Sequence, residues 1–280
     1  MLKPLFKWAG AKGKMMASYE PHLDFMANKD TLIDCFFGAG GFAVWARNKY
    51  PDMNIVAVEY NEEMMTVFET LRDHTDDFIK ECLKIEKEYL KLSDEGRYFF
   101  YYWKREQYAW NTGLTPVKRA AMLLFLMKTC FNGVWVTRNV TNGKFGTPPG
   151  ARNEKTVFNE VQLRTFAAFL NSITLISGDF AESSKFITDS SFVYCDPPYR
   201  DSHTPYAGGF DDNEQVRLTK FMKFAKDKGA AVAMSNKLGH DDFWDTHLPS
   251  WNYETFNVKY TVTRNGSEAK PDVEVLFINR

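Results

Sequence analysis

Residues 191–200, SFVYCDPPYR, are the most informative stretch of the chain. The apolar run 192–194 is typical of the end of a buried strand. The two prolines that follow lack backbone N–H groups and fix φ, so the strand must end in a stiff turn. This turn presents the Asp196 carboxylate, backbone carbonyls and the ring of Tyr199. Because open α/β sheets bind ligands at such strand ends, the stretch predicts a ligand site.

The composition is that of an ordinary globular chain. Of 280 residues, 44% are hydrophobic and 25% are charged, and the formal net charge is −1, so positive charge for binding phosphate must be concentrated locally. The four cysteines (Cys35, Cys82, Cys130 and Cys195) lack metal-ligand spacing and predict free thiols. Without a signal peptide or an apolar run of transmembrane length, we expect a cytoplasmic protein with neither membrane nor metal partners.

Glycines follow an earlier strand. Residues 31–37 (TLIDCFF) predict a strand, and residues 38–41 (GAGG) predict a tight turn before a helix over 42–49. The next apolar run, 54–58, ends at Glu59, about twenty residues past the turn, where nucleotide-binding folds place an acid that accepts hydrogen bonds from ribose. These elements predict half of a βαβ nucleotide-binding unit; a glycine turn followed by a surface Glu is the alternative.

The middle of the chain predicts helices and then an exposed loop. Residues 62–119 have helical periodicity, and we expect the aromatic-rich run 98–110 to pack its rings inward rather than to stack on nucleic acid. Residues 129–150 carry Asn-Gly and Pro-Pro turns among aromatic and basic residues, and predict a functional hairpin or long loop.

The remaining segments predict an α/β sheet. A helix over 157–170 precedes a short strand over 173–176, after which Asp179 is a second acid at a strand end. A buried strand over 230–235 and an antiparallel pair over 253–262 and 273–279 complete the expected sheet.

The order of these motifs resembles the DNA adenine-N6 methyltransferases of the Dam type, in their α-group arrangement. The resemblance runs through nearly the whole chain, and DPPY alone would be only suggestive. The matching motifs are KWAGAK (7–12), FFGAGG (36–41), Glu59, TCFNG (129–133), GDF (178–180) and DPPY (196–199).

The resemblance implies a Rossmann-like, S-adenosylmethionine-dependent methyltransferase sheet with an inserted, mainly helical target-recognition domain. The implied catalytic domain comprises residues 1–61 and 153–280, and the DNA-binding domain comprises residues 62–152. The residues implied to bind S-adenosylmethionine are Trp8, Lys12, Phe37, Gly38, Ala39, Gly40, Glu59, Tyr60, Asp179, Phe180 and Asp196.

The chemistry of DPPY suits methyl transfer to adenine. The exocyclic amine is a poor nucleophile because its lone pair is delocalised into the ring. Hydrogen bonds from N6–H to Asp196 and to the Pro197 carbonyl would restore the lone pair, and Asp196 would stabilise the positive charge that develops. Flipping the base out of the duplex costs a few kcal/mol, and stacking on Tyr199 would recover about 1–3 kcal/mol. The expected catalytic residues are Asp196, Pro197, Pro198 and Tyr199.

Duplex DNA is the implied partner. The residues expected to contact it are Phe131, Asn132, Val134, Arg138 and Lys144. Phe131 would wedge between bases and Asn132 would bind phosphate, although both could equally be packing and turn residues. The family commonly has a guanine-reading arginine three residues after the glycine of FNG, but this chain has Val136 there and an arginine at Arg138. GATC is therefore a starting hypothesis for the target, and a related or relaxed site is the alternative.

Other functions remain open at this point. An N-methyltransferase acting on RNA or on a protein amide would suit the same motif. A nucleotide-dependent oxidoreductase would leave DPPY unexplained and lacks a complete G-x-G-x-x-G, and a DNA-binding module without catalysis would not need the acids. We expect a monomer or weak dimer. The biological role (restriction-modification, phage anti-restriction or housekeeping) is left undecided.

Overall fold

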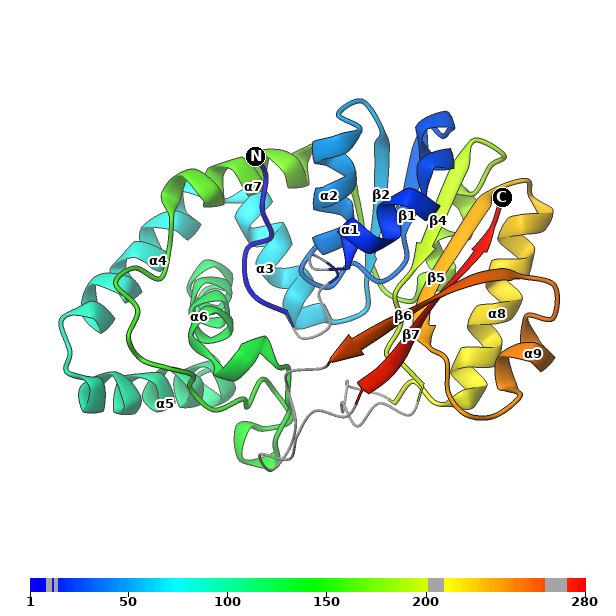
Figure 1. The fold of residues 1–280 in the computed structure, drawn as a ribbon. Coiled ribbons are helices and arrows are strands. Elements are labelled where there is room, and N and C mark those ends of the chain that lie inside the picture. Colours follow the sequence, from blue (N-terminus) through cyan, green and yellow to red (C-terminus); the bar gives the residue numbers. More distant parts are fainter. Residues whose placement is uncertain (9–11, 13–14, 201–208, 260–270) are drawn as a thin grey trace.

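A seven-stranded sheet forms the centre of the molecule, with strand order β3-β2-β1-β4-β5-β7-β6 (Figure 1). The computed structural model describes residues 1–8, 12, 15–200, 209–259 and 271–280. Strands β1 to β5 pair in parallel, whereas β7 runs antiparallel to β5 and β6. The bounds are β1 Thr31–Asp34, β2 Asn54–Glu59, β3 Thr174–Ser177, β4 Ser191–Cys195, β5 Ala231–Lys237, β6 Asn252–Lys259 and β7 Pro271–Asn279.

Helices flank the parallel strands of this sheet, whereas the first half of the edge strand β6 is exposed (Figure 1). The α-helices are α1 Met16–Tyr19, α2 Gly41–Lys49, α3 Glu62–Asp73, α4 Thr75–Leu90, α5 Asp94–Trp110, α6 Pro116–Thr129, α7 Glu160–Asn171, α8 Asp212–Asp227 and α9 Phe243–His247. Short 3₁₀ turns are η2 Glu20–His22, η3 Asp24–Asn28, η4 Phe131–Gly133, η5 Asn139–Thr141 and η6 Phe180–Phe186. No helix in the described part of the chain is long and apolar enough to cross a membrane.

The central strands are buried on both faces, as parallel strands covered by helices are. Leu32 and Phe192 point into one hydrophobic cluster, whereas Ile33 and Val193, the next residues along each strand, point into a second cluster that includes residues of α8 and α9. The expected α/β fold and its antiparallel closing pair are confirmed. The loop between β6 and β7 lies outside the described residues, as does most of the loop after Arg200.

The site is positioned where the strand order reverses, between β1 and β4. After β1 ends, Cys35 N–H still bonds to the Tyr194 carbonyl of β4 (3.0 Å), but Phe37 N–H bonds to the Val58 carbonyl of β2 (2.8 Å). The chain therefore crosses the gap between the two neighbours, and the predicted strand over 31–37 ends early, at Asp34. Such a switch point is where doubly wound sheets open a ligand crevice at the carboxyl ends of their strands.

Helices α3 to α6 extend beyond the β3 end of the sheet, next to α7 (Figure 1). Their buried rings, such as Phe78 and Phe125, belong to the same hydrophobic cluster as Leu32 and Ala57 of the sheet. The core thus continues across the expected boundaries at residues 61 and 152, and the division into a catalytic and a target-recognition domain stays a prediction.

Helix α5 differs from its sequence expectation. Tyr101 and Tyr108 are buried, but Phe99, Trp103 and Trp110 are 62%, 49% and 58% exposed. The expectation that the rings of 98–110 pack inward is therefore wrong for these three residues and for Tyr98, which is 39% exposed. The run is aromatic around the whole helix, and only one face meets the core.

Candidate functional site

Asp196 lies directly after β4, at the switch point. Its Oδ1 accepts hydrogen bonds from Ser235 Oγ of β5 (2.8 Å) and from Lys12 Nζ (3.0 Å). The side chain is 20% exposed, and no residue within the described ranges donates a hydrogen bond to Oδ2. One carboxylate oxygen is thus fixed by the protein while the other can accept a bond from a ligand.

Lys12 joins three elements at this point. Its Nζ lies 3.5 Å from Glu274 Oε1 of β7 as well as 3.0 Å from Asp196, and 4.4 Å from the centre of the Tyr199 ring. The Lys12 side chain is only 6% exposed, and Glu274 also accepts a hydrogen bond from Tyr19. A buried ammonium shared by two carboxylates is stable only when all three groups are held in place, so this network fixes the geometry of Asp196.

Burial raises the pKa of Asp196 above its ordinary value, and the Coulombic attraction of Lys12 acts in the opposite direction. Lys12 therefore favours the ionised carboxylate, the form that can accept two hydrogen bonds and stabilise a positive charge.

The glycine turn presents backbone rather than side chains. Gly38 and Gly40 have φ of +54° and +77°, and a Cβ on Gly38 would lie 3.2 Å from Nε1 of Trp8. Phe37 and Ala39 are buried in the core, at 3% exposure each. A cofactor at this turn would therefore meet the backbone of these residues and the Trp8 ring rather than the Phe37 ring.

Glu59 ties the glycine turn to the end of β2. Its Oε2 accepts from Gly38 N–H and its Oε1 from Asn61 N–H, both at 2.8 Å. Burial raises the pKa of Glu59 to about 7, and these two backbone bonds oppose the rise. Each oxygen keeps a lone pair, so the predicted bonds to ribose hydroxyls remain chemically available. Tyr60, the next residue, is 64% exposed beside it.

Asp34 is a further acid in the site, and it was not among the sequence predictions. It ends β1 at 1% exposure, and its Oδ2 is buried without a hydrogen-bond partner. Burial raises its pKa to about 7, helped by the nearby charges of Asp196 and Glu59. The signal was present in the sequence: an acid interrupts an otherwise apolar strand just before a glycine turn.

Asp179 and Phe180 lie at the β3 end, as expected, but with an unforeseen partner. Arg217 of α8 donates to both Asp179 oxygens (2.7 and 2.6 Å), and its guanidinium lies 4.1 Å from the centre of the Phe180 ring. This bidentate pair lowers the pKa of Asp179. The Phe180 ring is 3% exposed and packs on Phe36. The role of these residues beside a cofactor adenine stays a prediction.

The predicted DNA-contacting residues lie on a loop closed by two antiparallel bridges, Cys130 with Pro149 and Thr137 with Phe145. Phe131 is 50% exposed at its base. Asn132 and Gly133 both have positive φ, and a Cβ on Gly133 would lie 2.4 Å from the Lys7 carbonyl oxygen. The loop is therefore packed on the N-terminal segment through this glycine, and Trp8 contacts Trp135 beside it.

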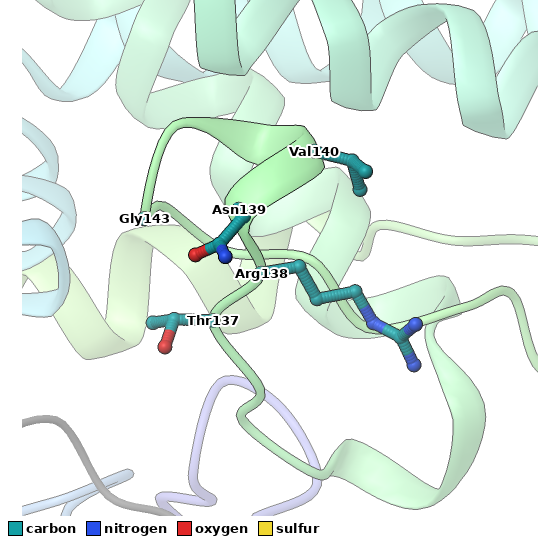
Figure 2. Close-up of a pocket in the computed structure, with 5 residues that line it drawn as sticks. All are labelled: Thr137, Arg138, Asn139, Val140 and Gly143. Atoms are coloured by element: carbon teal, nitrogen blue, oxygen red, sulfur yellow. The ribbon is translucent and has the colours of Figure 1, made fainter.

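The far end of this loop carries the basic residues. Figure 2 shows Arg138 extending away from Thr137 and Asn139, with which it lines a surface pocket of about 370 Å³. Val134 and Lys144 are partly buried, and Val134 O accepts from Thr147 Oγ1. The loop residues thus form a group of their own, whereas Lys12, Glu59 and Asp196 meet around the strand ends. Their contact with DNA stays a prediction.

Comparison with known proteins agrees with this arrangement. Residues 8–264 match the family described as D12 class N6 adenine-specific DNA methyltransferase. The chain belongs to this family. It is an adenine-specific DNA methyltransferase.

Relatives from this family match the chain over most of its length. It is 30% identical to Type II methyltransferase M.MjaIII of Methanocaldococcus jannaschii, covering 97% of this chain and 94% of the relative. It is 30% identical to a DNA adenine methylase of Haemophilus influenzae (84% and 79% covered) and 24% identical to that of Escherichia coli K12 (99% and 95%).

Among the described residues, no group of His, Cys, Asp and Glu could hold a metal ion. The four cysteines are buried and free.

The Asp34 environment predicts a pH-dependent change in stability. The pKa of Asp34 rises from its ordinary 3.8 to about 7 on folding, so the free energy of unfolding falls as pH rises between these values. Asp34→Asn removes the buried charge. We expect the variant to match the wild type near pH 4 and to exceed it by roughly 1–4 kcal/mol above pH 7, since one pKa unit corresponds to about 1.4 kcal/mol.

Urea unfolding of the ligand-free protein across this pH range measures the difference. Asp227→Asn, at an exposed carboxylate at the end of α8, is the control and should change little at any pH. A variant that is less stable than the wild type at pH 8 would show that Asp34 is not a strained buried charge.

Proposed function

We propose that the chain transfers a methyl group from S-adenosylmethionine to N6 of an adenine held at Asp196, Pro197 and Tyr199. The observation that carries this proposal is the state of Asp196: Oδ1 is fixed by Ser235 and Lys12, and the described residues leave Oδ2 open. An amine with two hydrogens needs two acceptors. The turn of residues 196–199, called the corner below, offers Asp196 Oδ2 and the Pro197 carbonyl.

The residues around the glycine turn fit a cationic cofactor. Asp34, Glu59 and Asp196 converge at the ends of adjacent strands, and burial raises the pKa of all three carboxyl groups. A sulfonium cation placed among them would offset this desolvation and favour the ionised acids. The backbone of Gly38 and Gly40 allows close approach, and Glu59 can accept from ribose hydroxyls. When bound, S-adenosylmethionine would supply the methyl group already activated as a sulfonium.

Asp196 acts on the amine of the target base. Accepting N6–H at Oδ2, it draws the nitrogen toward a tetrahedral geometry and so concentrates its lone pair. The positive charge that develops on N6 then lies beside a carboxylate that Ser235 and Lys12 have oriented beforehand, which needs no reorganisation during the reaction. The same carboxylate can accept the proton that N6 gives up.

Glu274 completes this electrostatic arrangement. If Lys12 paired with Asp196 alone, its charge would cancel much of the field on which N6 depends. Because Nζ also lies 3.5 Å from Glu274, the group of three charges is net negative. Lys12 can therefore orient Asp196 and support its ionised form while the site keeps its attraction for positive charge.

The Tyr199 ring would hold the flipped adenine. Lys12 Nζ lies over the ring, 4.4 Å from its centre, so we place the stacked base on the opposite face. Stacking there would provide about 1–3 kcal/mol, comparable with the cost of extruding the base.

The loop of residues 129–150 would read the DNA. It offers an exposed ring at Phe131 and an exposed cation at Arg138, and the Gly133 contact with Lys7 ties it to the segment that carries Lys12. Contact with bases would thus be linked structurally to the catalytic corner. We propose GATC or a related site, with Arg138 as the reader of guanine because an aliphatic side chain at Val136 cannot donate.

The product of the reaction tests the proposed function. The protein is incubated with unmethylated DNA and S-adenosylmethionine labelled in the methyl group, and the DNA is then digested to nucleosides. This should yield labelled N6-methyl-2′-deoxyadenosine. Asp196→Ala should abolish this product while the fold, measured by circular dichroism, is retained, because Lys12 still pairs with Glu274. Label in RNA or protein instead of DNA, or none at all, would refute the proposal.

The role of Arg138 is tested by the sequence that becomes methylated. Arg138→Ala removes a potential bidentate contact, which is worth about 1–3 kcal/mol of discrimination. We expect methylation to become less selective at one guanine position, as measured by methylation-sensitive sequencing. Arg164→Ala, at an exposed arginine of α7, is the control. Unchanged selectivity in Arg138→Ala would exclude Arg138 as the guanine reader.

A further inference from the structure

Two fully buried amide side chains lie behind the Asp196 corner. Gln215, in the first turns of α8, and Asn236, near the end of β5, are both 0% exposed. A buried amide is costly unless its donors and its acceptor are bonded, so their partners are informative. Neither residue contributes to the chemistry described so far.

Their hydrogen bonds form a continuous path that begins and ends on the corner. Gln215 Nε2 donates to the Pro198 carbonyl (2.9 Å), and Gln215 Oε1 accepts from Asn236 Nδ2 (3.1 Å). Asn236 Oδ1 in turn accepts from the Arg200 N–H (3.1 Å). The carbonyl of Pro198 and the N–H of Arg200 are thereby fixed on either side of Tyr199.

The direction of this path is set by its two ends. Pro198 offers a carbonyl, which only a donor can satisfy, and Asn236 Oδ1 also accepts from the Lys237 N–H (2.8 Å). Both amides can satisfy these ends in one orientation only, because reversing either would place donor against donor or acceptor against acceptor. The path therefore requires an amide donor at Gln215.

The path also distinguishes the two proline carbonyls. Pro198 is engaged by α8, whereas Pro197 has no hydrogen-bond donor within the described part of the chain. Ser235, immediately before Asn236 on β5, bonds to Asp196 Oδ1. Ser235 thus orients the Asp196 carboxylate, and its neighbour Asn236 acts through Gln215 on the backbone of the same corner.

We propose that Gln215 and Asn236 are positioning residues for methyl transfer. Their two linked side chains, called the amide relay below, fix the backbone of the corner. The Pro197 carbonyl and Asp196 Oδ2 are thereby held together as the acceptor pair for N6–H. The relay rests on the proposed function, because its effect is exerted on the target amine. It touches neither substrate nor cofactor. Its loss should lower kcat and leave the KM for S-adenosylmethionine nearly unchanged.

A pH profile of Gln215→Glu separates this role from a merely structural one. The neutral acid can still donate to Pro198 and accept from Asn236, whereas the ionised acid would set two acceptors against each other. Relative to wild type at the same pH, we expect kcat to be near normal in acid and to fall by about tenfold or more as pH rises through the pKa of the new carboxyl group. Gln215→Met, which cannot donate, should be slow at every pH.

Gln162→Glu is a matched control, because Gln162 Nε2 also donates to a proline carbonyl, that of Pro4 (2.7 Å), away from the corner. It should keep the wild-type profile. Wild-type kcat in both Gln215 variants, or an equal loss in both at every pH, would overturn the relay. If Gln215→Glu does not fold at neutral pH, a normal kcat in Gln215→Met would overturn it. Wild-type enzyme that forms no N6-methyladenine would refute the proposed function itself, and the relay with it.

Discussion

The buried ammonium group of Lys12 lies between two carboxylates, those of Asp196 and Glu274. This contact joins the N-terminal segment, the end of β4 and strand β7, which are far apart in the sequence. Because an unpaired charge in such a place would cost several kcal/mol, none of the three elements can shift without the others. The chain has a net charge of only −1, so its site is defined by where these charged groups are placed and not by an excess of one charge.

Two kinds of constraint converge on the proposed catalytic turn at residues 196–199. Side-chain contacts from Lys12 and Ser235 orient the Asp196 carboxylate, and buried amides fix the backbone that follows it. The double proline helps to keep the carbonyls of this turn available, because two peptide groups without N–H donors cannot hydrogen-bond to them. Asp34 and Glu59, whose pKa values are raised by burial, lie beside the glycine turn. A cation bound there would stabilise their ionised forms.

Much of the fold and part of the site could be predicted because their causes are local. The glycine turn and the double proline each dictate backbone geometry from a few adjacent residues, and the order of apolar runs predicted an α/β sheet closed by an antiparallel pair. The parallel pairing was implied by the family resemblance. Ser235, Glu274 and Gln215 could not be found this way, because ordinary polar residues on a strand or helix gain a role only through tertiary packing. The inward packing expected for Trp103 failed for the same reason: periodicity cannot show which faces of an aromatic helix find a partner.

The central claim is that an ionised, preorganised Asp196 activates the target amine. The most direct test is the single-turnover rate of methyl transfer in Asp196→Asn, whose amide keeps the shape of the side chain but loses its charge. We predict a loss of about 10²–10³-fold at saturating S-adenosylmethionine, the usual effect of removing one preorganised electrostatic group, with DNA binding within about threefold of wild type. A rate within a few-fold of wild type would contradict the account.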